Sequence, residues 1–222
     1  MSDSENEGKR DIDLISNDSD TTFFESIMHQ LEITGGTQIA RRYLAMNAFD
    51  GILPVVGIIM GGFISLANQN SQLVFETILL SSIGTAIAMF VSGITSSYLT
   101  EQAERKRDVK ELEKSMLSDM GHTVYAKASR TTTIVVSIIN GISPTFAALG
   151  TITPMFIALT GLLDYVVSMY ASIVAGLILL YALGMFLGKI SKVNLWIAGL
   201  KTLAAGFLTV ILMIIISILT ST

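Results

Sequence analysis

Residues 45–67 read AMNAFDGILPVVGIIMGGFISLA, and this stretch decides the fold class. It holds one charged residue, Asp50, and it is longer than the roughly 20 apolar residues that a helix needs to cross about 30 Å of hydrocarbon. Four later stretches have the same character: residues 73–98, 131–158, 166–188 and 194–219. The sequence therefore predicts an all-α integral membrane protein with five transmembrane helices.

The composition supports this class and excludes others. Of 222 residues, 51% are hydrophobic and 14% are charged, whereas soluble domains carry about 25% charged residues. The chain has no cysteine, which excludes disulfides, thiolate metal sites and cysteine nucleophiles. Metalloprotease, P-loop, nucleophile-elbow and dinucleotide motifs are also absent from the sequence. We therefore expect no enzyme, no tightly bound cofactor and no nucleic-acid partner.

The polar segments divide the chain into five parts. Residues 1–20 hold seven acids and few apolar groups, which predicts a disordered acidic tail. Residues 21–44 are expected to form amphipathic interfacial helices, because apolar side chains from Phe24 to Leu31 recur at helical spacing before Gly35. The remaining parts are a transmembrane hairpin at 45–98, a charged cytoplasmic helical segment at 99–130 that continues the second span, and three further spans at 131–222.

Basic residues predict the orientation of these spans. Thirteen of the fourteen Lys and Arg residues lie in residues 1–44, in block 99–130 or in the 189–193 link, which are alternate polar segments. Because short cytoplasmic loops carry the excess of Lys and Arg, the N-terminus is expected inside and the C-terminus outside. No organellar address is visible in the sequence, so we expect the plasma membrane.

Asp50 is the main candidate for binding a cation. A carboxylate at membrane depth costs on the order of 2.5–3.5 kcal/mol on insertion scales, and such a residue usually faces a cavity or a partner. Pro54 removes a backbone hydrogen bond one turn later and frees a carbonyl oxygen near Asp50. Together these groups outline a hard-oxygen cation site. The alternative is a hydrated acid at the start of a helix near the inner interface.

Other residues of the first two spans are weaker candidates. Met46 lies four residues before Asp50, on the same helix face, and Met89 is a second intramembrane thioether that soft-metal chemistry could use. Glu76 is placed at the outer end of the second span, either as a further ion site or as an acid that favours the helix dipole. The spacing Gly57-x-x-x-Gly61 permits close approach to another span or to a second subunit.

The third span carries a polar face, interrupted by Pro144 and Pro154, that consists of Asn140, Ser143, Thr145, Thr151 and Thr153. Its hydroxyl and amide groups either line a water-filled path or hydrogen-bond neighbouring helices. The pentapeptides DGILP at 50–54 and NGISP at 140–144 form a faint repeat, for which chance similarity is an equally good explanation.

Beyond the second span, Glu101, Glu104, Asp108 and Glu111 follow one helix face. Such a carboxylate stripe could collect divalent cations at a cytoplasmic mouth. Basic residues alternate with the acids, so the charge pattern alone favours a solvated helix with internal salt bridges.

Three features resemble the vacuolar iron transporter family: FDGILP at 49–54, GITSSYLTEQAE at 93–104, and Pro144 and Pro154 in the third span. The resemblance covers about residues 38–220. It implies five spans, export of Fe²⁺ and often Mn²⁺ from the cytosol in exchange for protons, and a homodimer with the ion path between the first spans.

By this resemblance, Asp50 matches the family's first-span aspartate and Glu76 an outer glutamate, while Glu101, Glu104 and Glu111 match cytoplasmic metal-collecting glutamates. Two departures are visible. Gly93 stands where the family often has a methionine, with Met89 one turn away, and block 99–130 is too short for a complete three-helix metal-collecting domain. Both departures bear on iron selectivity more than on cation transport.

The leading hypothesis from the sequence is a proton-coupled divalent metal transporter that exports Fe²⁺ or Mn²⁺ from the cytosol. Its partners would be the lipid bilayer, the transported metal ion, protons and a second copy of the chain. One alternative is a helical bundle without transport activity that presents a cytoplasmic interaction helix. Another is a channel or a carrier of a different solute.

Overall fold

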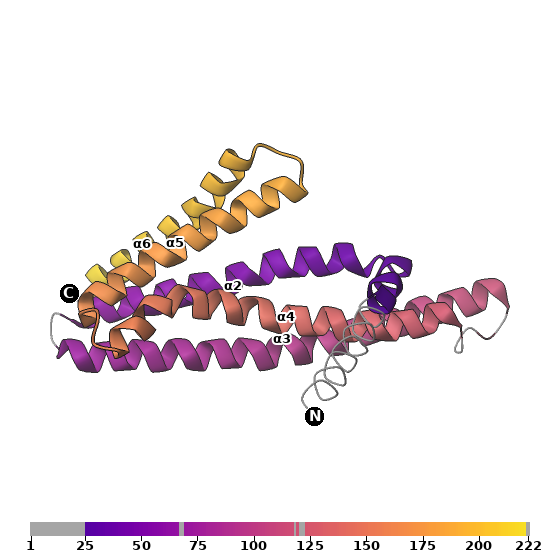
Figure 1. The fold of residues 1–222 in the computed structure, drawn as a ribbon, viewed down its shortest axis with the longest axis horizontal. Coiled ribbons are helices and arrows are strands. Elements are labelled where there is room, and N and C mark those ends of the chain that lie inside the picture. Colours follow the sequence, from indigo (N-terminus) through magenta and orange to yellow (C-terminus); the bar gives the residue numbers. More distant parts are fainter. Residues whose placement is uncertain (1–24, 67–68, 118, 120–122, 221–222) are drawn as a thin grey trace, which may run out of the picture. The chain divides into compact units, whose positions relative to one another are not determined.

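The computed structural model describes residues 25–66, 69–117, 119 and 123–220; the predicted acidic tail at 1–20 lies outside them. The described residues form helices and connecting turns, with no strand among them. The long helices are α2 (Gly36–Ser65), α3 (Ser71–Met116), α4 (Val124–Leu159), α5 (Tyr165–Ile190) and α6 (Leu195–Thr220), as Figure 1 shows. Each contains a window that is long and apolar enough to cross a membrane, which confirms the prediction of an all-α protein with five such helices.

Three of the helices extend well beyond the apolar stretches that predicted them. α3 runs without a break for 46 residues, or about 69 Å at 1.5 Å per residue, as its predicted continuation into the charged block requires. α2 begins at Gly36 and α4 at Val124, before their predicted spans at 45 and 131. The predicted bounds followed the apolar side chains. Backbone hydrogen bonding does not depend on them and also continues through the neighbouring polar residues.

The chain folds as two compact units, each built from segments that are distant in sequence. The charged unit consists of the described residues of Met1–Ala40 and Tyr98–Val136, and the apolar unit consists of the described residues of Arg41–Ser97 and Ser137–Thr222. Helices α2, α3 and α4 each contribute residues to both units.

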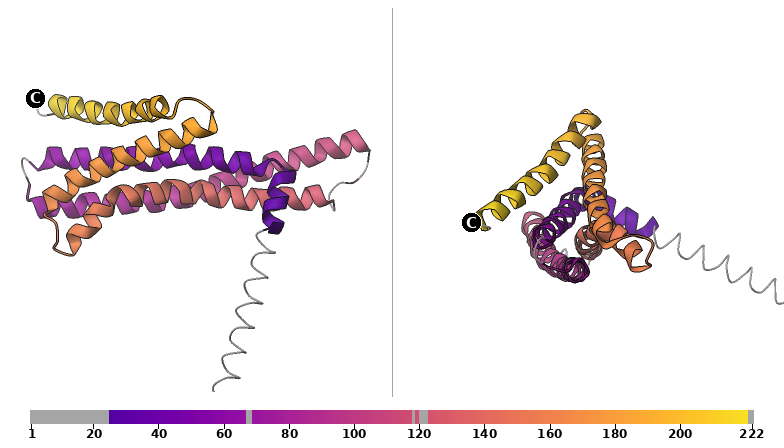
Figure 2. Two further views of the ribbon diagram at one scale, coloured as in Figure 1. Left: turned by 45° about the horizontal axis from the view of Figure 1, so that its top comes forward. Right: turned by 90° about the vertical axis from the view of Figure 1, so that its left-hand side faces the viewer.

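In the apolar unit, the segments from α2, α3 and α4 run side by side, and α5 and α6 form a hairpin (Figures 1 and 2). Large side chains fill the core, among them Ile59, Phe75, Ile152 and Met155. The outer faces are also apolar: Leu80 and Phe146 are each 70% exposed, and only 6% of the most apolar window of α6 is buried. An exposed apolar surface of this extent suits a lipid environment, as expected of a membrane protein.

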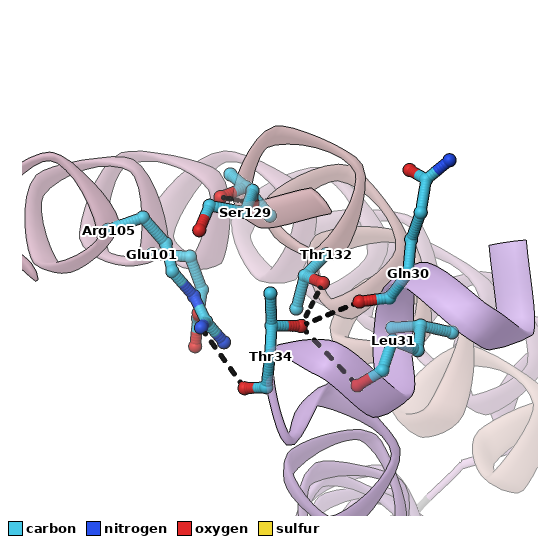
Figure 3. Close-up of polar contacts among 8 residues, drawn as sticks. Gln30, Leu31, Thr34, Glu101, Arg105, Ser129 and Thr132 are labelled. Atoms are coloured by element: carbon cyan, nitrogen blue, oxygen red, sulfur yellow. Dashed lines mark hydrogen bonds and ion pairs between the residues drawn. The ribbon is translucent and has the colours of Figure 1, made fainter. Parts of the chain in front are cut away.

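In the charged unit, residues 25–33 are helical and a turn at Gly35, with φ +65°, separates them from α2. This helical segment lies within residues 21–44, for which amphipathic helices were predicted. It buries Leu31, whereas Met28 is half exposed. The turn allows Thr34 to reach two helices at once (Figure 3): its hydroxyl shares a hydrogen bond with Thr132 of α4, and its carbonyl oxygen accepts one from Arg105 of α3.

Candidate functional site

Two contacts at glycines bring α4 against both α2 and α3 within the apolar unit. Gly51 of α2 lies against the carbonyl oxygen of Pro144, where no Cβ atom would fit, and a Cβ on Gly93 of α3 would lie 2.8 Å from the Cα of Gly141. The absence of side chains at these positions therefore sets the spacing of the three helices. Asp50 directly precedes Gly51, and Asn140 directly precedes Gly141. Both polar residues therefore lie at the edge of these contacts.

A cleft of about 470 Å³ opens beside these contacts. Six of its lining residues carry a side-chain oxygen, contributed by all three helices: Asn47 and Asp50 of α2, Thr85, Ser92 and Ser96 of α3, and Asn140 of α4. Asp50 is the one acid among the described lining residues, and its side chain is exposed at the surface of the chain. The cleft therefore holds an accessible carboxyl group among several side-chain oxygens.

Hydrogen bonds hold the amides of the cleft in place. The side-chain amide of Asn47 donates to Oδ1 of Asn140, and Nδ2 of Asn140 donates to the carbonyl oxygen of Gly93 at 3.4 Å. Within the described part of the chain, no group donates a hydrogen bond to the Asp50 carboxylate and no basic side chain pairs with it. Asp50 is thus the ionisable lining group that is left available to an ion, a proton or water.

Backbone carbonyl oxygens add to the groups of the cleft that could bind a cation. Proline has no N–H to donate. The carbonyl oxygen four residues before Pro54, and that four residues before Pro144, therefore lacks its usual hydrogen-bond partner in the helix. These carbonyls belong to Asp50 and Asn140, and both residues line the cleft. The carbonyl oxygen of Asn140 lies beside Gly93, 2.9 Å from where a Cβ would be. The two members of the faint repeat therefore meet at one site.

Of the other residues singled out in the membrane segments, some line the cleft and others do not. Met89 and Pro144 line the cleft, whereas Pro54 and Met46 are exposed and lie outside its lining, Met46 with 56% exposure. Glu76 is also outside: it is exposed and accepts a hydrogen bond from Gln72 at 3.0 Å. It precedes Thr85 by nine residues, or about 13 Å along α3, so the structure does not bring it to Asp50.

The glutamates of the charged unit are not gathered into a cluster. Glu101 is 2% exposed and pairs with Arg105 at 3.5 Å, Glu111 pairs with Arg107 at 3.0 Å on the surface, and Glu104 is exposed. Among the residues that the structure describes, no three His, Asp or Glu side chains come together as a potential metal site. Glu101 and Glu111 thus each form a salt bridge within α3.

The structure distinguishes the roles of the polar groups of α4. Ser143 donates a hydrogen bond to the Leu44 carbonyl of α2, and Thr145 donates to the Ala86 carbonyl of α3. The hydroxyls of Thr151 and Thr153 donate to carbonyls of α4 itself. Within the polar face predicted on the third span, Asn140 therefore lines the cleft, whereas these four hydroxyls donate hydrogen bonds to backbone carbonyl oxygens.

Sequence reasoning did not single out four of the polar lining residues. Thr85, Ser92 and Ser96, together with Met89, lie at spacings of three and four residues on one face of α3. Asn47 precedes Asp50 by one helical turn. This periodicity is visible in the sequence, but it became informative only when the partner face on α2 was known.

Comparison with known proteins gives one informative relationship. An uncharacterized protein of Methanocaldococcus jannaschii is 30% identical to this chain over 192 residues, which cover 85% of this chain and 92% of that protein. No family model matches the chain, and no solved structure matches it. At this identity and coverage, the chain belongs to the same family as this archaeal protein.

Proposed function

We propose that the protein is a proton-coupled transporter that exports Fe²⁺ or Mn²⁺ from the cytosol, with Asp50 as the residue that carries the ion. One observation supports this most strongly. The carboxylate of Asp50 has no partner among the described residues and lies in a polar cleft between three membrane-length helices. An ionisable group at membrane depth is a functional site by default, because its desolvation would otherwise be a cost without compensation.

The oxygen and sulfur atoms of the cleft are suitable ligands for a divalent first-row metal ion. Carboxylate, amide and carbonyl oxygens are ligands that Mn²⁺ accepts readily, and the thioether of Met89 adds a softer donor that favours Fe²⁺ over Mn²⁺. Hydroxyls of Ser92 and Ser96 can hold the waters that remain on the ion. Ligands of this kind support a transported ion better than a permanent one, because they bind more weakly than clusters of carboxylates or thiolates.

A single carboxylate neutralises half the charge of a divalent ion, which supports a second copy of the chain at the site. On α2, Met46, Asp50, Pro54, Gly57 and Gly61 recur at spacings of three and four residues, and all five are at least partly exposed. A Cβ at Gly57 would meet nothing within 4 Å. A homodimer formed through this face would bring the two copies of Asp50 towards one another.

Proton coupling follows from the charge on the same residue. Once the metal ion has left, a proton on Asp50 neutralises the carboxylate and lowers the cost of keeping it within the membrane. The excess of Lys and Arg in alternate polar segments supports an orientation with the N-terminus and block 99–130 on the cytoplasmic side. With this orientation, the ion would enter from the cytosol and protons would move in the opposite direction. We place the protein in the plasma membrane.

The test is metal uptake into proteoliposomes, with and without a pH gradient, for wild type and for Asp50→Asn. We expect the variant to lose more than about tenfold in rate, since an interaction of ~1.4 kcal/mol is worth a factor of ten. Asp164→Asn is the matched control, because Asp164 is an exposed acid whose side chain caps no helix amide.

The result also separates the alternatives. Equal uptake by Asp50→Asn and wild type would remove Asp50 from the transport path. Uptake that is indifferent to the pH gradient would indicate a channel, and no metal uptake by wild type would indicate a bundle without this activity.

A further inference from the structure

A second cavity lies within the charged unit, and the transport proposal assigns no role to it. Its volume is about 680 Å³, and residues from α3 and α4 line it. Four of them are basic: Arg105, Lys106 and Lys110 of α3, and Arg130 of α4. Glu113 is the one acid among the described lining residues, and Glu101 pairs with Arg105 at the wall, so the site carries an excess of two positive charges. A cavity of this charge favours an anion.

Arg105 is held in place at the wall of this cavity. It is 8% exposed, donates to the carbonyl oxygen of Thr34 at 3.3 Å and pairs with Glu101 at 3.5 Å (Figure 3). An arginine fixed in this way loses little further freedom when it binds an oxyanion, because its planar set of donors is already oriented. Lys106, Lys110 and Arg130 are exposed and can move towards a ligand.

Ser129 provides an independent indication of a ligand. It is 2% exposed and lines the cavity, and its Oγ has no hydrogen-bond partner in the described part of the chain. A buried hydroxyl without a partner lowers stability, and such groups are rare in folded proteins. An anionic oxygen bound in the cavity would accept the hydrogen bond that Ser129 can donate.

The position of the cavity along the two helices indicates the source of the anion. Its lining includes Tyr98, the last residue of the predicted apolar stretch 73–98, and Ile134, close to the start of the stretch 131–158. The cavity therefore lies where apolar and charged segments meet on both helices. Lipid phosphates occupy this level of a membrane protein, and basic pockets between helices there bind anionic headgroups.

We propose that this cavity binds a phosphate-bearing anion and that the headgroup of an anionic membrane lipid supplies it. Arg105 and Arg130 contact the phosphate oxygens through their guanidinium groups, Ser129 donates a hydrogen bond, and Lys106 and Lys110 add positive charge. Tyr98 lies at the interface level, where amphipathic aromatic rings are favoured. The bound headgroup would join α3 and α4 at the point where both leave the apolar region.

The test measures binding of phosphatidylglycerol and of phosphatidylcholine to the full chain in neutral detergent, with a parallel titration of inorganic pyrophosphate. The variants are Ser129→Ala and the double variant Lys110→Gln/Arg130→Gln. The control is Arg107→Gln/Lys127→Gln, which removes the same charge from the same helices at exposed residues outside the lining.

We expect a preference for phosphatidylglycerol that falls about tenfold or more in the double variant, falls several-fold in Ser129→Ala and is retained in the control. If pyrophosphate binds with this same dependence and phosphatidylglycerol does not, the anion site stands and its source is a soluble phosphate. The proposal is overturned if neither probe binds preferentially, or if the control loses as much affinity as the double variant. Ser129→Ala removes an unpaired hydroxyl, so its fold should be retained.

Discussion

Gly51 of α2 lies directly against the carbonyl oxygen of Pro144 in α4, with no room for a side chain between them. Each of these residues belongs to one member of the faint repeat, DGILP at 50–54 and NGISP at 140–144. The contact brings the two pentapeptides together, and Asp50 and Asn140 consequently line the same cleft. The polar site thus depends on a packing contact between a glycine and a proline carbonyl.

Gly51→Ala should destabilise the protein by about 1–3 kcal/mol, because an added methyl group in a well-packed contact forces the backbones apart. Gly84→Ala is the matched substitution: its Cβ would meet nothing within 4 Å, so stability should be unchanged or slightly higher, as alanine favours helix. Unfolding in detergent micelles, followed by circular dichroism, measures both. Equal effects of the two substitutions would contradict the close contact.

Gly57→Cys should form a disulfide-linked dimer in the membrane if the α2 face joins two copies of the chain. The wild-type chain contains no cysteine, so any cross-link arises from the introduced residue, and Cα atoms must approach within about 7 Å for it to form. Val174→Cys is the control, on an exposed face of α5. Mild oxidation followed by non-reducing gel electrophoresis reports the result; comparable cross-linking of both variants would indicate random collision.

Glu101→Gln should cost about 3–5 kcal/mol of stability, because it leaves the Arg105 guanidinium buried without its ionic partner. The surface pair formed by Arg107 and Glu111 has the same spacing but is largely exposed, so Glu111→Gln should change stability by less than about 1 kcal/mol. Thermal unfolding of both variants compares a buried and an exposed pair on one helix. A metal-collecting role for Glu101 without a structural one would predict normal stability and reduced metal uptake.

Met89→Leu should lower uptake of Fe²⁺ relative to Mn²⁺ by a few-fold, because it removes the one thioether among the described lining residues and keeps the oxygen ligands. The two side chains have similar volumes, so the fold should tolerate the change. Met46→Leu is the comparison on α2, since Met46 lies outside the cleft lining. The ratio of the two uptake rates in the same proteoliposomes is the measured quantity; an unchanged ratio would show that sulfur does not contribute to selection.

The helices could be predicted because each depends on a local property of the sequence. Residues 45–67 and the four later stretches are long and apolar enough to cross a membrane whatever packs against them, and each of the five corresponds to a helix. The absence of Gly and Pro from residues 99–120 likewise allowed α3 to continue into the charged block. Asp50 stood out for the same reason, as a charge in an apolar stretch.

The sequence by itself determined the five helices and the presence of a carboxylate within the first of them. The tertiary structure decided which residues share a site with that carboxylate: it brought Asn140, Met89 and Ser92 to Asp50 and left Met46 and Glu76 outside the cleft. It also decided that Glu101 is buried against Arg105. Helix formation follows from hydrogen bonds and side chains within a few residues, whereas these neighbours depend on how closely separate helices approach, which contacts at Gly51 and Gly93 set.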